Sequence, residues 1–262
     1  MFGSFGVWGS WQQGWGDEPE RVAELERLGY GTFWLGGSPG ADLAIPERLL
    51  NATKNITIAT GVVNVWDSPA AEVSRSFHRL GSDRFVLGVG PGHRQLDQAY
   101  EKPYAKLVSY LDELDVPREQ VVLAALGPKT LKLAADRTAG SHPYLVPVAH
   151  TAHARAVLGD GVLAPEVTAV VEEDPEAARA IARQMLGFYL TLTNYTGNLL
   201  RHGFTADDFA NDGSDRLVDA LFAWGSPEQV AAKLRSHLDA GANHVAIQSL
   251  NGRYAELAEA LF

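Results

Sequence analysis

The sequence predicts an α/β protein whose strands and helices alternate and close into a (β/α)8, or TIM, barrel. Eight short apolar runs recur along the chain, and a segment of helical periodicity follows each of them. One strand and one helix together take roughly 30 residues, as parallel βαβ units require. The chain has 262 residues, which suits one barrel, so we assign 1–262 to a single domain. A doubly wound open sheet would normally carry G-x-G-x-x-G after its first strand, and residues 6–16 lack it.

The strands are the apolar, β-branched runs between turn signals. We expect them at 2–8, 32–35, 56–65, 84–89, 121–125, 144–148, 165–171 and 244–248. Gly61 interrupts the third strand, which indicates a bulge or a close approach of another group. Residues 94–102 are expected to form a loop.

The helices are predicted from apolar spacing of three and four and from their end signals, often Pro in the first turn or Gly after the last. We expect helices at 17–28, 42–53, from 68, from 103, from 128, at 149–158, 216–224 and 227–240, and from 254. Apolar residues from 178 to 199 alternate steps of three and four, which predicts one long helix beginning near Asp174.

The composition excludes several classes of function. The chain contains no Cys, so disulfides, thiolate nucleophiles and Cys-based metal sites are excluded. Its formal net charge is −10, spread over many helices, which argues against a nucleic-acid partner. No apolar stretch approaches the length of a membrane span, and no signal peptide is evident, so we expect a cytoplasmic protein without membrane contact. The cluster Asp207, Asp208, Asp212 and Asp215 matches no calcium loop and is interpreted as a solvated face.

In barrel enzymes the site lies at the carboxyl ends of the strands, so the residues at the strand exits are the candidates. The exits carry indoles, glycines, one Asn and His93, but no paired carboxylates and no metal-like cluster of histidines. Such a mouth fits a large planar cofactor that supplies the chemistry itself. His93 is the candidate for proton transfer, because an ordinary imidazole titrates near neutral pH.

A phosphate cradle is expected where the fifth strand ends at Gly127-Pro128. Pro128 fits the first position of a helix, and the amides of Lys129 and Thr130 then lack partners within the helix. Amides at a helix N-terminus bind anions, although Gly-Pro is also ordinary turn chemistry. Together with residues at the exits of the third and fourth strands, the candidate cofactor-binding residues are Thr60, Gly61, Val62, Asn64, Gly90, Ala125, Gly127, Pro128, Lys129 and Thr130.

Several of these segments resemble the bacterial luciferase-like superfamily, most closely its oxidoreductases that depend on the deazaflavin coenzyme F420. The segments are Ile58-Ala59-Thr60-Gly61-Val62-Val63-Asn64, Arg84-Phe85-Val86-Leu87-Gly88-Val89-Gly90, and Ala124-Ala125-Leu126-Gly127-Pro128-Lys129. The resemblance runs nearly end to end. It implies a flavin or deazaflavin ring across the barrel mouth, a phosphate near Gly127, a non-prolyl cis bond between Gly61 and Val62, and a homodimer.

The chain departs from the family's sugar-phosphate dehydrogenases. Those enzymes carry Asp-His after the second strand and Glu after the fourth, where this chain has Leu35-Gly36-Gly37 and His93. The stretch 80–84 also looks shorter than is usual. Sugar-phosphate chemistry is therefore not expected.

Three hypotheses follow for the function. The first is an oxidoreductase that moves a hydride between F420 and a small apolar substrate held by Trp8, Trp34, Gly36 and Trp66. The second is a monooxygenase that uses FMN and oxygen. The third is a cofactor-binding protein without turnover, suggested by the scarcity of acid and base residues. For the acidic tail of F420, the nearest cations expected are Lys129, Arg94 and Lys106.

Overall fold

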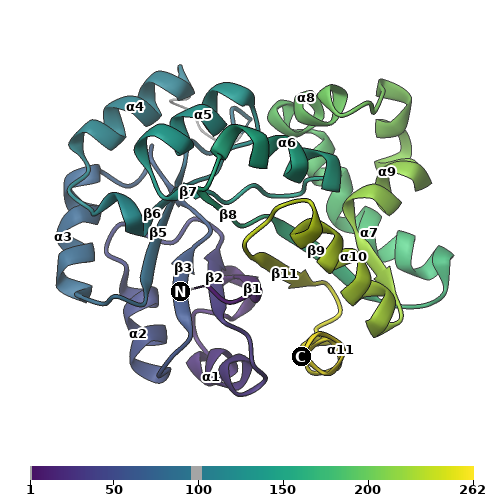
Figure 1. Ribbon diagram of the computed structural model, residues 1–262, viewed down its shortest axis with the longest axis horizontal. Helices are drawn as coiled ribbons and strands as arrows, with labels where there is room; N and C mark the ends of the chain where they lie inside the picture. Colours follow the sequence, from purple (N-terminus) through teal and green to yellow (C-terminus); the bar gives the residue numbers. More distant parts are fainter. Residues whose placement is uncertain (1, 96–101) are drawn as a thin grey trace.

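Parallel strands curl into a TIM barrel in the computed structural model of the protein, which describes residues 2–95 and 102–262. Figure 1 shows the helices arranged around the strands. The ring consists of β1 (Phe5–Ser10), β2 (Thr32–Gly36), β3 (Thr57–Thr60), β5 (Phe85–Gly90), β6 (Val121–Leu123), β7 (Gly140–Ser141), β8 (Val162–Leu163), β9 (Glu166–Val171) and β11 (Val245–Ser249). β8 pairs with β7 and β9 pairs with β11. Only Ala164 and Pro165 separate β8 from β9, so the two segments follow each other as one strand of the ring. The ring closes because this strand pairs with β7 at its start and with β11 further along.

Helices follow most strands and cover the outside of the barrel. They are α1 (Pro19–Arg27), α2 (Ala44–Ala52), α3 (Ala70–Leu80), α4 (Pro103–Glu113), α5 (Pro128–Arg137), α6 (Val148–Leu158), α10 (Pro227–Asp239) and α11 (Tyr254–Leu261). The predicted end signals act as expected at α10, where Ser226 and Gln229 form a capping box ahead of Pro227. No helix among the described residues has the length and apolar content to cross a membrane.

Two apolar layers fill the barrel region. The larger layer lies between the strands and the surrounding helices and includes Phe33, Leu35, Ile58 and Leu87. The smaller one lies inside the ring and includes Trp8, Trp34, Ala59, Val86 and Val122. Residues of the two groups alternate along β2, β3, β5, β6 and β11, as the period of two requires for a barrel filled on both sides.

The connection between β9 and β10 (Ala223–Gly225) holds an additional helical unit with its own apolar core. It contains α7 (Pro175–Leu190), α8 (Thr193–Arg201), a 3₁₀ segment (Ala206–Asp212) and α9 (Asp215–Leu221). In Figure 1 this unit forms the green region at one side of the barrel.

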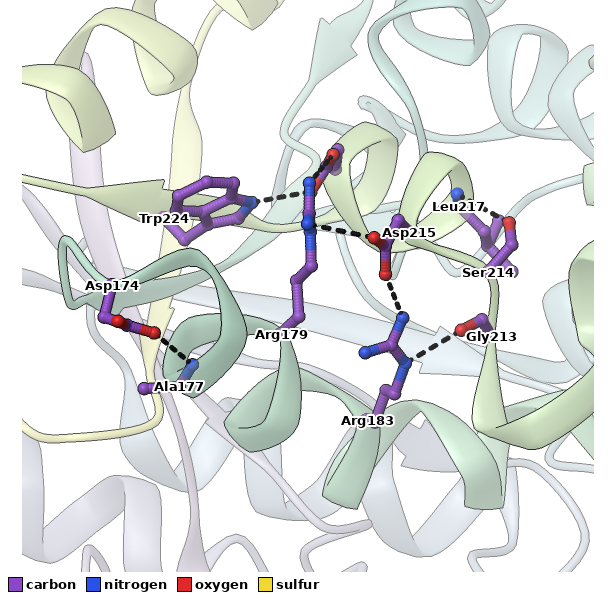
Figure 2. A network of polar contacts seen from close by, with 10 residues as sticks. Asp174, Ala177, Arg179, Arg183, Gly213, Ser214, Asp215, Leu217 and Trp224 are labelled. Carbon is purple, nitrogen blue, oxygen red and sulfur yellow. Dashed lines mark hydrogen bonds and ion pairs between the residues drawn. The ribbon is translucent and has the colours of Figure 1, made fainter.

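Arginines of α7 hold α9 in place (Figure 2). Arg179 donates to Asp215 at 2.9 Å and, through two nitrogens, to Asp219 at 2.7 and 3.0 Å. Arg183 donates to Asp215 and, at 2.9 Å, to the carbonyl of Gly213. Asp215 therefore bridges two guanidinium groups and fixes the start of α9 against α7.

The acidic cluster is consequently not a purely solvated face. That interpretation was wrong for Asp208, whereas Asp215 pairs with the two arginines but keeps a side chain that is 60% exposed. Asp208 is buried and accepts from Ser214, Arg216 and the Thr205 amide. These contacts, the Thr205 amide first, lower the pKa of Asp208 to about 2. Within the described residues, no group of three His, Asp or Glu side chains could hold a metal ion.

Three predicted elements differ from the structure around the barrel. The third strand is divided at Gly61 into β3 and β4 (Val63–Asn64), and β4 pairs with β5. The sixth strand lies at Gly140–Ser141, not at 144–148, because Pro143 has no N–H for a ladder and Leu145 has a φ of 52°. The predicted helix over 216–224 ends at Leu221, and its last residues form β10 instead.

The predicted long helix is also divided, into α7 and α8. Leu192 between them is extended, with φ −94° and ψ 114°, and is buried in the core of the helical unit. Thr191 bonds back to the carbonyl of Phe188, which favours an end to the helix at this point. The loop predicted over 94–102 lies mostly outside the described residues.

Candidate functional site

A cavity of about 800 Å³ opens at the carboxyl ends of the strands, where barrel enzymes place their sites. The ends of β1, β5, β6, β7 and β11 form its inner wall, and α4, α7 and α8 form its outer wall. Nine of the residues that the sequence singles out line it: Trp8, Gly61, Val62, Asn64, Gly90, His93, Ala125, Gly127 and Thr130.

Three of the four residues predicted for the substrate pocket are not among the residues that line this cavity. Trp34 is fully buried inside the ring, donates to His244 Nε2 at 3.0 Å and stacks on His142 at 4.0 Å between ring centroids. Gly36 is buried beneath Trp8, whose ring a methyl group at Gly36 would overlap. Trp66 donates to the Pro91 carbonyl at 2.8 Å and has Lys106 Nζ 5.5 Å from its ring centroid.

Three predicted cofactor-binding residues also lie outside the cavity lining. The Thr60 hydroxyl donates to the Gly88 carbonyl and accepts from the Gly88 amide, both at 2.8 Å, and so ties β3 to β5. Pro128 and Lys129 are exposed at the start of α5. Lys129, Arg94 and Lys106, the cations expected for an acidic tail, do not line the cavity.

The inner wall is built around the peptide bond between Gly61 and Val62, which is cis as the resemblance implied. Trp8 Nε1 donates to the Gly61 carbonyl at 3.2 Å. A Cβ added to Gly61 would lie 2.8 Å from Trp8 Nε1 and 3.2 Å from His142 Nε2. Only glycine therefore fits at this position without displacing Trp8, and the wall presents no side chain here to a flat ligand.

The cradle expected at Gly127 has the geometry of an anion site. Gly127 is the extended residue before α5, and no side chain of a described residue caps the helix. The first helical amide with an intrahelical partner is that of Leu131, which donates to the Gly127 carbonyl. Among the described residues, a Cβ at Gly127 would meet only Arg201 Nη2, at 3.8 Å. Free amides and a guanidinium group therefore face the same part of the cavity.

His142 is a cavity residue that the sequence reasoning missed. Its Nδ1 lies 2.7 Å from the Ala164 carbonyl, which fixes the proton on Nδ1, and Nε2 has no hydrogen-bond partner among the described residues. Burial lowers the pKa of His142 to about 3, so the ring is neutral at physiological pH. A His directly after a strand, in Ser141-His142-Pro143, is the signal that could have identified it.

A group of tyrosines forms a further wall of the cavity, and two of them, Tyr189 and Tyr195, were also missed. Tyr144 donates to Gln248 Oε1 at 2.6 Å, and Tyr189 donates to Tyr144 at 3.2 Å. The ring of Tyr195 lies 5.1 Å from that of Tyr189 and 5.6 Å from that of His93. Burial raises the pKa of Tyr189 to about 12 and those of Tyr144 and Tyr195 well above 10. All three hydroxyls therefore stay protonated.

Glu166 lies beneath this wall and is a buried carboxyl group. It accepts from the Leu145 amide at 3.1 Å and from the Thr168 hydroxyl at 2.6 Å. Burial raises the pKa of Glu166 to about 7. It does not line the cavity, so we assign it to the barrel interior.

The barrel, with a glycine-lined and aromatic cavity at its mouth, defines an enzyme class in which a bound cofactor does the chemistry. A family model for luciferase-like monooxygenases matches residues 111–244. The chain belongs to this family and is an enzyme of the oxidoreductase or monooxygenase type. Comparison with curated protein sequences gives no match.

Solved structures share the fold at low sequence identity. An F420-dependent secondary alcohol dehydrogenase in complex with an F420-acetone adduct is 14% identical, with a TM-score of 0.76 over 100% of both chains. A coenzyme F420-dependent tetrahydromethanopterin reductase from Methanopyrus kandleri is 16% identical, with a TM-score of 0.73 over 98% of this chain and 96% of that one. The oxygenating constituent of a Pseudomonas putida 3,6-diketocamphane monooxygenase, in complex with FMN, is 13% identical, with a TM-score of 0.66 over 100% of this chain and 96% of that one.

Proposed function

We propose that the protein is an oxidoreductase that transfers a hydride between the deazaflavin coenzyme F420 and a small organic substrate. The observation that carries this proposal is the juxtaposition, in one cavity, of a flat glycine wall at Gly61 and an anion cradle at Gly127. A planar ring with a phosphate-bearing side chain needs both features at once.

The residues present fit such a cofactor. The cavity of about 800 Å³ lies within the usual range for small-molecule sites, about 300 to 1,000 Å³. Gly61, Val62, Asn64 and Gly90 would face the ring. When bound, the deazaflavin supplies the hydride, and these residues orient it and exclude water from one face.

The phosphate would be held by Gly127, by the free amides at the start of α5, and by Arg201. Arg201 would supply the cation of the cradle, because α8 brings its guanidinium to the cavity. The side chain of Lys129, which the sequence assigned to the acidic tail, is exposed outside the cavity. An arginine offers a planar pair of donors to phosphate, which a lysine does not.

The outer wall is suited to an organic substrate. Leu107, Met185 and Phe188 line it together with the ring of Tyr104. Phe188 and Tyr104 are 51% and 45% exposed, so large apolar surfaces lie open on the cavity's outer side. A substrate with an apolar body would enter past them.

An FMN-dependent monooxygenase is the second candidate, supported by the likeness to the FMN-bound monooxygenase. We favour F420 because the TM-scores to the F420-dependent enzymes, 0.76 and 0.73, exceed that to the FMN enzyme, 0.66. The homodimer implied by the resemblance stays a prediction.

A reoxidation assay tests the proposal. The protein is incubated with reduced F420 or with reduced FMN, and the absorbance is followed after addition of ketones, aldehydes or enones, or of oxygen. We expect substrate-dependent reoxidation of F420 and none by oxygen. Oxygen-dependent turnover of FMN with product formation would support the monooxygenase instead, and tight binding without turnover by any substrate would support a binding protein.

A further inference from the structure

The tyrosine wall of the cavity, formed by Tyr144, Tyr189 and Tyr195, has one hydroxyl whose proton no described residue accepts. The Tyr189 hydroxyl donates to Tyr144, and the Tyr144 hydroxyl donates to the amide oxygen of Gln248. An amide oxygen has no proton to give, so the direction of both bonds is fixed. The Tyr189 proton is therefore engaged by Tyr144, and the Tyr144 proton is engaged by Gln248.

The Tyr195 hydroxyl is in a different position. In the part of the chain that the structure describes, it makes no hydrogen bond, yet it is not among the polar atoms that are sealed from solvent without a partner. Tyr195 as a whole is only 6% exposed and lines the cavity. The accessible part of this side chain, its hydroxyl included, therefore opens into the cavity.

The division of the predicted long helix brings Tyr195 to this wall. Tyr189 and Tyr195 are six residues apart, and on one continuous helix they would point about 120° apart. The extended residue Leu192 changes the direction of the chain between α7 and α8. The rings of Tyr189 and Tyr195 therefore meet edge to face, with centroids 5.1 Å apart. The same break brings the Tyr195 ring to 5.6 Å from that of His93.

We propose that Tyr195 donates a hydrogen bond to the oxygen of the substrate, and that the substrate class is therefore carbonyl compounds, such as ketones and enones with an apolar body. The geometry provides a neutral donor in the same cavity as Gly61, between the rings of Tyr189 and His93. A buried donor left unpaired costs free energy, so the site discriminates against ligands without an acceptor at this point.

The reaction part of this proposal rests on the proposed function. In carbonyl reduction, a bound reduced deazaflavin would supply the hydride to the carbonyl carbon, and Tyr195 would supply the proton to the oxygen as the π electron pair moves onto it, which gives the alcohol. Tyr195 would regain its proton through water in the open cavity, from the proton that the deazaflavin loses on oxidation. The binding part needs no turnover, so it can be tested separately.

Binding of two isosteric ligands tests the role of Tyr195. Acetophenone carries a carbonyl oxygen where α-methylstyrene carries a CH₂ group, so the pair differs in the acceptor alone. Affinities are measured by ligand-observed NMR titration, with the protein alone and with oxidised F420 added. The infrared carbonyl stretch of bound acetophenone reports the hydrogen bond directly.

Tyr195→Phe should weaken acetophenone roughly 3- to 10-fold, the worth of one neutral hydrogen bond, and raise its carbonyl stretch. Its affinity for α-methylstyrene should not change. Tyr189→Phe should have a smaller effect on acetophenone, because its proton already goes to Tyr144. Tyr110→Phe removes a buried hydroxyl outside the cavity and serves as the inert control.

Three results would overturn the proposal: an equal loss for both ligands in Tyr195→Phe, a carbonyl stretch that the substitution leaves unchanged, or no saturable binding of acetophenone to the wild type with or without F420. Failure of the protein to bind F420 would refute the proposed function but not the hydrogen bond, because the two ligands can still be compared on the protein alone.

Discussion

The substitution Gly127→Asp separates the stability of the cradle from its ability to bind phosphate. Gly127 precedes α5 with φ −87° and ψ 157°, a conformation that any residue adopts. Asp is a preferred residue at this position, so the helix should gain a few tenths of a kcal/mol. The added carboxylate would lie beside Arg201, whose Nη2 is 3.8 Å from the added Cβ, and would occupy the place of the phosphate.

The expected magnitude follows from the bonds that are lost. Each charge-assisted hydrogen bond to the phosphate contributes about 1.5 to 3 kcal/mol, and about 1.4 kcal/mol corresponds to a factor of ten. Affinity for F420 or FMN should therefore fall at least tenfold, by fluorescence titration, while the Tm stays equal or rises. Gly127→Ser is the matched control, since it caps the helix without a charge and should lose less affinity. Undiminished binding by Gly127→Asp would refute the cradle.

Two further predictions concern the barrel interior. Below pH 4.5 both states of Glu166 hold the proton, and between pH 4.5 and about 7 only the folded state does, so the free energy of unfolding falls as the pH rises through this window. Glu166→Gln should remove this fall, so its stability relative to wild type should increase by roughly 2 to 3 kcal/mol between pH 5 and pH 8 in urea unfolding; a difference that is the same at both pH values would argue against it. Gly36→Ala should push Trp8 toward the cavity and cost about 1 to 3 kcal/mol of stability, and an unchanged Tm with unchanged ligand affinity would contradict the packing described.

The barrel could be predicted because its signals are local. Apolar runs of strand length, Pro in the first turn of helices and Gly after their ends mark most elements, and the structure keeps this order. The position of the cavity followed from the general rule for strand exits. That rule placed Gly61, Gly90, Ala125 and Gly127 correctly at the cavity.

The side chains that complete the cavity depend on geometry that the sequence does not show. Trp8 and Trp34 lie in register on adjacent strands, yet Trp8 lines the cavity and Trp34 does not. Strands of a barrel are tilted and staggered, so residues in register reach different depths along its axis. The pattern of apolar residues alone could not distinguish the two indoles.

The tyrosine wall escaped prediction for a related reason. Tyr195 was placed on one long helix because the apolar spacing continues unbroken through residues 190–193. The break arises from the burial of Leu192 in the core of the helical unit, a tertiary contact that overrides local periodicity. Arg201 follows the same break, so the cation of the cradle could not be identified from the sequence either.

The central claim, a deazaflavin held in this cavity, is tested most directly by titrating the wild-type protein with F420 and with FMN at low and moderate salt. F420 carries an acidic tail in addition to the phosphate, so it brings more negative charge than FMN does to Arg201, the cation that lines the cavity beside Gly127. The account predicts tighter binding of F420, because the charges of its tail add to the attraction by Arg201. It also predicts a steeper salt dependence, because charges at an open site are screened over about 10 Å at 0.1 M salt. Equal or tighter binding of FMN would contradict it.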